Sequence, residues 1–255
     1  YKMKDLKLTH IIVCILLALL VHIIFEAIVR PEALIAISNA NANGESLPRT
    51  FSIIIKDLEQ EICIILFLIG IYLITSKIFQ LNSKKYLFDV DFLEDIGSNK
   101  VSGEKAIYEL EKLPLDISSS PLIITLKASL RRYMITDNVQ NTSDAITVSV
   151  NNLSLRLDSE NTMIRYLIWA IPSLGFVGTV RGIGQALSNA DKALEGDISG
   201  MAQSLGVAFN STFVALLISL VLMLLLHLLQ RMEDNLLINI QSYSEKFLLN
   251  RISRT

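Results

Sequence analysis

Two long apolar segments between Ile168 and Leu229, joined by a short polar turn, most constrain what this chain can fold into. Each is long enough to cross a bilayer, because about 20 residues of helix span the hydrocarbon core. Both also carry residues that a simple membrane anchor does not need. The first contains Pro172, Gly175, Gly178, Thr179, Arg181 and Gly182, and the second contains Asn210, Ser211 and Thr212. These residues indicate a role beyond anchoring.

The composition of the whole chain agrees with a membrane protein. Of its 255 residues, 51% are hydrophobic and only 19% are charged, whereas about a quarter of a soluble domain is charged. A formal net charge of −2 gives no reason to expect nucleic-acid binding. Cys14 and Cys63 lie inside apolar runs, so we expect packing residues rather than a disulfide or metal pair. The sequence begins with Tyr1 instead of methionine, which is typical of a piece of a longer chain.

The hydropathy pattern predicts an all-α membrane protein with four transmembrane helices and a helical cytoplasmic insertion between the second and third. The apolar runs His10–Phe25 and Ile62–Ile74 form the first two helices, joined by a polar connection at residues 30–58. In order, we predict residues 1–80 as helices one and two with a short periplasmic connection, 81–165 as the cytoplasmic helical region, 166–230 as helices three and four, and 231–255 as a cytoplasmic C-terminal helix.

The region 81–165 is charged and amphipathic. A helix is predicted to begin at Pro121, because proline is favoured in the first turn. A polar break follows at Thr136–Ser143. From Asp144, apolar residues recur every three or four positions, with no glycine or proline before Pro172. We therefore expect this helix to run straight into the third transmembrane helix.

The distribution of lysine and arginine predicts the topology, because basic residues are concentrated on the cytoplasmic side of membrane proteins. With both termini and residues 81–165 in the cytoplasm, 17 basic residues lie inside and four outside. The chain is thus predicted to be a multi-pass protein of the bacterial inner membrane, with both termini cytoplasmic.

The third apolar segment has one face of small residues. Pro172, Gly175, Thr179 and Gly182 recur at helical spacing, so they share a face. Small residues let membrane helices pack closely, and Gly178 adds to this set. The same face can border an ion path, since it carries the hydroxyl of Thr179. Both interpretations stay open at this point.

The fourth segment runs in the opposite direction and carries a second hydroxyl at matching depth. Thr179 and Thr212 lie roughly 13 Å and 10 Å from the outer ends of their helices, at 1.5 Å per residue. Asn210 and Ser211 are close by, although a serine hydroxyl in a membrane often bonds to a carbonyl four residues earlier. Neither segment contains Asp or Glu, and a proton path normally needs an ionisable group. The carboxylate of an ion path is therefore expected from another chain.

These two segments resemble the MotA/TolQ/ExbB family of proton-channel motor subunits. The family's third-helix pattern, roughly P-x-L-G-L-L-G-T-V-x-G, is matched by Pro172, Leu174, Gly175, Gly178, Thr179, Val180 and Gly182. The fourth-helix pattern, roughly A-L-x-x-T-x-x-G-L, is matched by Ala208, Thr212 and Leu216, with Phe209 and Ala215 in place of the family's Leu and Gly. The four-helix arrangement is more similar to MotA, and the third-helix motif to TolQ and ExbB.

The resemblance implies a homopentamer in the lipid bilayer around two copies of a single-span MotB/TolR/ExbD-like subunit. The membrane aspartate of that partner would bind and release ions beside Thr179 and Thr212, in an ion path that includes Ser211 and Asn210. Ion flow would then drive rotation, since one charge crossing 100 mV releases about 2.3 kcal/mol. The transported ion is H⁺ or Na⁺, and the threonine pair does not distinguish them. Flagellar rotation, Tol- or Ton-like energising, gliding and antiphage defence all fit.

No nucleophile motif, phosphate loop or zinc signature occurs, so neither an enzyme nor a cofactor or metal site is predicted. His22 and His227 are lone histidines in apolar runs and are expected to pack. Arg181 is expected to form a structural ion pair with Glu26, with snorkelling or a role in the ion path as alternatives. The alternative function is a non-conducting four-span scaffold that uses its glycine-rich face for packing only.

Overall fold

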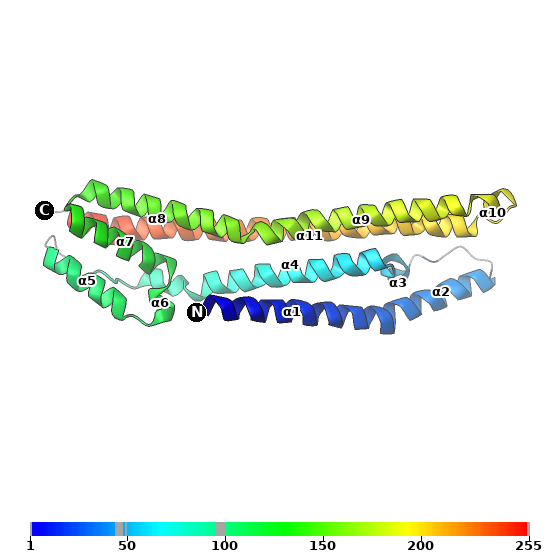
Figure 1. Ribbon diagram of the computed structural model, residues 1–255, viewed down its shortest axis with the longest axis horizontal. Helices are drawn as coiled ribbons and strands as arrows, with labels where there is room; N and C mark the ends of the chain where they lie inside the picture. The colour runs from blue at the N-terminus through cyan, green and yellow to red at the C-terminus, as the bar shows by residue number, and fades with distance from the viewer. Residues whose placement is uncertain (1, 44–47, 49, 95–99, 254–255) are drawn as a thin grey trace. The chain divides into compact units, whose positions relative to one another are not determined.

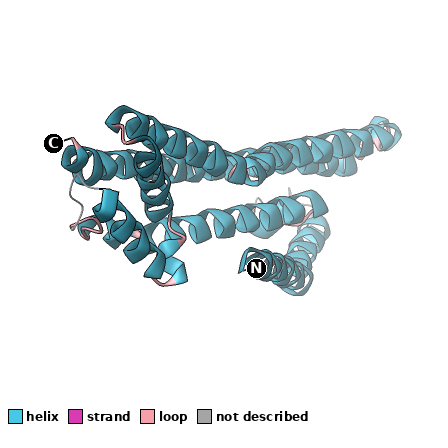
Figure 2. Ribbon diagram, turned by 60° about the vertical axis from the view of Figure 1, so that its left-hand side comes forward, coloured by secondary structure: helices cyan, strands magenta, loops and turns pink. Residues whose placement is uncertain are grey.

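The computed structural model describes residues 2–43, 48, 50–94 and 100–253, and all the regular elements within these ranges are helices (Figures 1 and 2). The chain divides into two compact units. The first unit comprises Tyr1–Ile74 with Met163–Leu226, and the second comprises Thr75–Thr162 with His227–Thr255. The sequence pattern had placed these borders at residues 80, 165 and 230.

Four helical stretches are long and apolar enough to cross a membrane, which confirms the predicted fold class of an all-α membrane protein. They are Leu8–Ala40, Leu58–Asp89, Val139–Ser188 and Ser199–Ile252. The helices that supply their apolar cores are α1 (Lys2–Ile24), α4 (Leu58–Ser83), α9 (Thr162–Ser188) and α11 (Ser199–Ser244). In the first unit, α1 lies alongside α4, and α9 lies alongside α11 (Figure 1).

The first half of the polar connection predicted at residues 30–58 is helical and continues the first helix. Helix α1 continues through a π-helical turn, η1 (Phe25–Val29), into α2 (Arg30–Asn43). The amide of Arg30 bonds to the carbonyl of Phe25, five residues earlier. This wider turn makes room for Pro31, whose ring would collide with a carbonyl in a regular α-helix. A short helix, α3 (Phe51–Ile55), precedes α4.

Helix α4 packs against both α9 and α11 within the first unit. The Sγ atom of Cys63 lies 3.5 Å from the carbonyl oxygen of Ile171 on α9. A Cβ atom placed on Gly70 would lie 2.8 Å from a side-chain carbon of Leu222 on α11. An apolar cluster of Val21, Phe25, Val29, Ile55 and Val214 joins the end of α1 to the same bundle. Cys63 is therefore a buried packing residue.

The second unit is a helical bundle with its own apolar core. Its core includes Leu87, Leu93, Leu110, Leu122, Leu126, Leu130, Ile146, Ile240 and Leu248. Its helices are η2 (Lys85–Asp89), α5 (Lys100–Lys112), α6 (Leu115–Ser118), α7 (Pro121–Thr136), α8 (Val139–Glu160), the end of α11, η3 (Glu245–Leu249) and α12 (Asn250–Ile252). The core is formed by the apolar faces of amphipathic helices, with leucine and isoleucine as its most frequent residues.

The ends of α7 and α8 follow ordinary capping chemistry. Ser120 caps α7 and Pro121 occupies its first turn, as predicted. The predicted polar break at Thr136–Ser143 is shorter than expected, because only Asp137 and Asn138 lie between the helices. Asp137 takes a left-handed conformation with φ of 50°, which Asp tolerates better than most residues. Helix α8 then runs into α9 with a single break at Asn161.

The segment after η2 is held against the C-terminal helices by two polar side chains. Tyr243 donates a hydrogen bond to the carbonyl of Val90 (2.8 Å) and accepts one from the amide of Phe92 (3.0 Å). Arg251 contacts both carboxylate oxygens of Asp91 (2.5 and 3.2 Å). Burial on its own would raise the pKa of Asp91, but the hydrogen bonds from Arg251 and from the Leu93 amide outweigh it and hold that pKa below its usual range.

Replacing Tyr243 with Phe should lower the free energy of unfolding by about 1–3 kcal/mol, because the carbonyl of Val90 loses its donor and the amide of Phe92 loses its acceptor. Unfolding of the detergent-purified chain would be followed by circular dichroism. Tyr86→Phe is the matched control, since Tyr86 is exposed and should tolerate the change. Equal effects of the two variants would contradict the anchoring role of Tyr243.

Candidate functional site

Helices α9 and α11 approach each other closely along the glycine face predicted from the sequence. A Cβ atom on Gly175 would lie 2.5 Å from the Cβ of Ala215, and one on Gly178 would lie 2.5 Å from the Cβ of Ser211. At Gly182 the obstruction would be backbone, with the Ala208 nitrogen at 2.6 Å. No side chain fits at these three positions, so the backbones of the two helices lie nearly in contact.

Thr179 and Thr212 meet within this contact. Their hydroxyl oxygens lie within hydrogen-bonding distance of each other. The Thr179 hydroxyl also reaches the carbonyl of Ala208 on α11 (3.0 Å), and the Thr212 hydroxyl reaches the carbonyl of Gly175 on α9 (3.2 Å). The two threonines, which the sequence placed at similar depth, thus form a hydrogen-bonded chain between the helices. Both side chains are only partly buried.

The donors of this threonine pair are fully used. Each hydroxyl has one proton and two lone pairs. Either Thr179 donates to Thr212 and Thr212 to Gly175, or Thr212 donates to Thr179 and Thr179 donates to the carbonyl of Ala208 (3.0 Å) or of Gly175 (3.3 Å). In each arrangement both protons are used within the helix pair, and each oxygen keeps at least one lone pair. The pair can therefore accept a hydrogen bond or contact a cation.

The other predicted residues of this region have different surroundings. Ser211 is buried against Gly178, and its hydroxyl donates to the carbonyl of Val207 (2.8 Å), four residues earlier. Asn210 is partly buried and has no hydrogen-bond partner among the described residues. Pro172 lies inside α9, one turn before Gly175. Only the two threonines are brought together.

The predicted ion pair between Arg181 and Glu26 is wrong. The Nη2 atom of Arg181 lies 2.7 Å from Glu59 and 3.8 Å from Asp57, while Glu26 pairs with Arg30 one turn along its own helix. The reason is that α4 begins at Leu58 and not near Ile62. Its first turn therefore brings carboxylates into the bundle beside α9, where the sequence suggested only flanking charges.

Glu59 is the residue that the sequence analysis missed. It is 7% exposed and lies against Gly178, next to Thr179 in the sequence. The expectation that a carboxylate near this face must come from another chain was therefore incomplete. A usable signal was present, because Arg181 had no partner on its own segment and DLEQE opens the second apolar run.

A second charged group occupies the same turn of α4 but points toward α1. Glu61 is 3% exposed and contacts Nδ1 of His22 (2.7 Å) and Nη2 of Arg30 (2.5 Å). Arg30 also pairs with Glu26. His22 is thus a hydrogen-bonding residue and does more than pack. A buried carboxylate bonded to both an arginine and a histidine is typical of a structural anchor.

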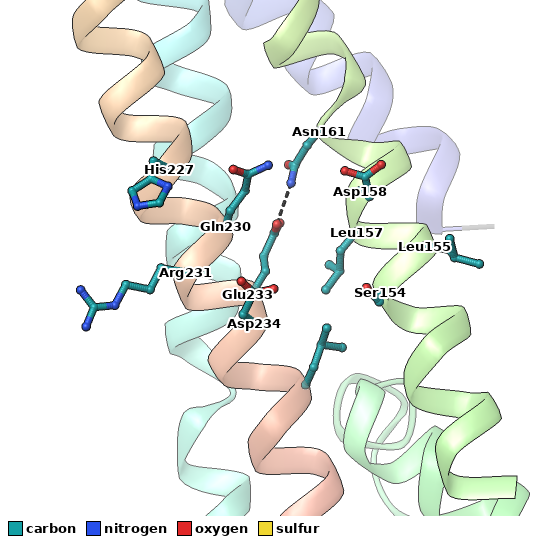
Figure 3. Close-up of a pocket in the computed structure, with 11 residues that line it drawn as sticks. Ser154, Leu155, Leu157, Asp158, Asn161, His227, Gln230, Arg231, Glu233 and Asp234 are labelled. Carbon is teal, nitrogen blue, oxygen red and sulfur yellow. Dashed lines mark hydrogen bonds between the residues drawn. The ribbon is translucent and has the colours of Figure 1, made fainter. Parts of the chain in front are cut away.

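The second unit contains a polar cleft of about 610 Å³ between α8 and α11 (Figure 3). The amide of Asn161 donates to Glu233 (2.6 Å) and its oxygen accepts from Lys77 (2.8 Å). Lys77 also lies 3.5 Å from Glu160 and 3.6 Å from Glu233. These bonds tie the break between α8 and α9 to α4 and α11. His227 also lines the cleft. The bonds of Asn161 and Lys77 there hold helices together and are therefore structural.

Residues 118–242 match the family model of the MotA/TolQ/ExbB proton channel family. Over these residues, just under half of the chain, it is similar to the MotA/TolQ/ExbB proton channel family. Searches of curated proteins and of solved structures gave no match. The family match indicates a proton-channel role in an ion-driven membrane complex.

The part that matches the family model includes α7, α8, α9 and most of α11, and therefore both threonines and the glycine contact. Helices α1 and α4 lie outside it. The family match therefore does not include Glu59 and Glu61, and their surroundings are known only from this structure.

Gly182→Ala should destabilise the bundle by about 1–3 kcal/mol, because the added Cβ atom would clash with the backbone of α11, which cannot rotate away as a side chain can. Gly184→Ala is the matched control, because a Cβ atom there meets nothing within 4 Å. It should be neutral or stabilising by up to about 1 kcal/mol, as alanine favours helix. Thermal unfolding in detergent compares the two variants, and a Gly184→Ala loss as large as that of Gly182→Ala would contradict the close contact.

Proposed function

We propose that this chain is the channel-forming subunit of an ion-driven rotary motor in the bacterial inner membrane. Five copies would surround two copies of a single-span MotB/TolR/ExbD-like partner. A carboxylate of the partner would bind and release H⁺ or Na⁺ beside Thr179 and Thr212. The observation that carries the proposal is the hydrogen-bonded threonine pair, which joins α9 to α11 within the family-matched region.

The hydrogen bonding of the threonine pair suits such a partner. Because both hydroxyl protons are used within the helix pair, only oxygen lone pairs are left for a ligand. A protonated carboxylic acid can donate to them, and a carboxylate that carries a cation can share the cation with them. A carboxylate without a proton or a cation would find only hydrogen-bond acceptors at the threonine pair. The pair therefore favours the ion-loaded partner over the unloaded one.

The charge distribution supports the orientation. The basic residues favour cytoplasmic termini and a cytoplasmic second unit. Thr179 would then lie in the outer half of the membrane. An ion released from that depth toward the cytoplasm crosses most of the membrane potential, and a full crossing of 100 mV yields about 2.3 kcal/mol per charge.

The alternative of a non-conducting scaffold rests on the glycine contact. Packing explains Gly175, Gly178 and Gly182 completely, because each faces an atom of α11 at close distance. It does not explain two threonines whose oxygens keep free lone pairs at a partly exposed place. Ion flux is the property on which the two functions differ.

The variants Thr179→Val and Thr212→Val should each lower ion flux by roughly tenfold or more, the effect of about 1.4 kcal/mol from one lost hydrogen bond. The complex would be purified from its own membranes with its bound partner, reconstituted into vesicles and assayed with H⁺ and Na⁺ gradients. Threonine to serine changes should preserve most of the flux, because the hydroxyls remain.

Ser219→Ala is the control for this experiment. Ser219 also donates from α11 to α9, at the carbonyl of Ile168 (3.0 Å), but away from the threonine pair. Its loss should leave flux within about twofold of wild type if the effect is local. A wild-type complex that conducts neither ion, or valine variants that conduct normally, would favour the scaffold.

A further inference from the structure

The side chain of Glu59 packs against α9 at Gly178, where the helix has no side chain. Its Cγ atom is 3.3 Å from the place that a Cβ on Gly178 would take. Gly178 directly precedes Thr179, so the carboxylate and the threonine pair meet neighbouring residues of one helix turn. The same glycine that lets α11 approach on one side makes room for Glu59 on the other.

Three buried oxygens at the start of α4 have no hydrogen-bond donor among the described residues. They are Oδ2 of Asp57, Oε2 of Glu59 and Oε1 of Gln60. Gln60 is fully buried, and its amide nitrogen donates to the carbonyl of Ile54 (3.1 Å), which leaves its oxygen free. Buried acceptors in proteins are almost always satisfied. These oxygens therefore point to water or a proton donor at this end of α4.

The charge pairing around Glu59 is loose compared with that of Glu61. Arg181 Nη2 is 2.7 Å from Glu59 Oε2, but the geometry is not that of a hydrogen bond. The same guanidinium is 3.8 Å from Asp57, which Lys56 contacts at 2.9 Å. The Arg181 side chain is 40% exposed. Asp57 and Glu59 thus share the positive charges of Lys56 and Arg181, and the Arg181 side chain is partly exposed.

We propose that Glu59 is a proton-carrying residue of the ion path, which passes protons from the polar start of α4 to the partner carboxylate at the threonine pair. The proposal rests on the proposed function. A hydronium ion near Asp57 and Gln60 gives its proton to a Glu59 oxygen and becomes water. That O–H bond then breaks as the partner's carboxylate takes the proton, and Glu59 returns to the carboxylate that faces Arg181.

Several charged or titratable groups face Glu59, and they define the experiment. They are Arg181 on α9, Lys56 and Asp57 before α4, and Cys63 one turn further along α4. Glu59→Gln removes the proton-carrying oxygen and keeps the shape of the side chain. Glu26→Gln is the matched control, because it removes a carboxylate from the same unit that is 53% exposed and pairs only with Arg30 among the described residues.

In reconstituted vesicles with the bound partner, Glu59→Gln should lower proton flux by about tenfold or more, as expected for a lost proton-transfer group. The remaining flux should depend less on the pH at the α4-start side. Glu59→Asp should keep measurable flux with a shifted pH profile, since it keeps a carboxyl. Glu26→Gln should assemble and conduct like wild type.

The double variant Glu59→Gln/Arg181→Gln separates a proton-carrying role from a structural one. If Glu59 only neutralises Arg181, removing both charges restores flux. If Glu59 carries protons, flux stays low although pentamer assembly, measured by light scattering, is normal. Restored flux in the double variant, normal flux in Glu59→Gln, or flux that depends on sodium and not on pH overturns the proposal.

The proposed function can survive that failure. If the threonine variants stop ion flux and Glu59→Gln does not, the ion path stands and the role of Glu59 is wrong. If the wild-type complex conducts no ion, both are wrong.

Discussion

The near-contact of the α9 and α11 backbones is the constraint on which the rest of the first unit depends. A hydroxyl on one helix can reach a carbonyl on the next only when no side chain separates them, and here Thr179 reaches Ala208 because Gly175, Gly178 and Gly182 carry none. In a bilayer the hydrophobic effect does not hold helices together, so close packing and interhelical hydrogen bonds must do so. The geometry that stabilises the bundle therefore also aligns the two hydroxyls. Stability and the candidate ion site cannot be separated at these positions.

Among the described residues of the first unit, the two buried glutamates lie in the first turn of α4, and they are paired in two different ways. Glu61 bonds to His22 and Arg30 and has no free oxygen among the described contacts, which suits a fixed anchor between α1 and α4. Glu59 has one cationic neighbour without hydrogen-bond geometry and an oxygen with no donor. A buried carboxylate is expensive unless it is paired and hydrogen-bonded. Two residues of the same type, two positions apart, thus differ in how completely they are satisfied, and incomplete satisfaction is what a group that takes up protons requires.

The sequence predicted those features that depend on position along a helix and missed those that depend on rotation and on helix ends. The four spans follow from hydropathy, and the similar depth of Thr179 and Thr212 follows from rise per residue. The partner of Arg181 was wrong because Glu26 and Glu59 lie at similar depth, and only the orientation of α4 and its start at Leu58 decide between them. The continuation of α1 to Asn43 was missed because Pro31 normally ends a helix, and no sequence rule predicts the π-helical turn that accommodates it.

The threonine pair and Arg181 favour different protonation states of a carboxyl group that lies beside them. A protonated acid has one proton to donate and needs an acceptor, whereas an ionised acid needs donors. The threonine pair offers lone pairs, while Arg181 offers N–H groups. A proton that leaves a carboxyl beside Arg181 for one beside the threonines moves to the place where the protonated form is better bound. In the proposed ion path, this asymmetry would give the transfer a preferred direction and would need no carboxylate on α9 or α11 themselves. The apolar segments of these two helices indeed contain no acidic residue.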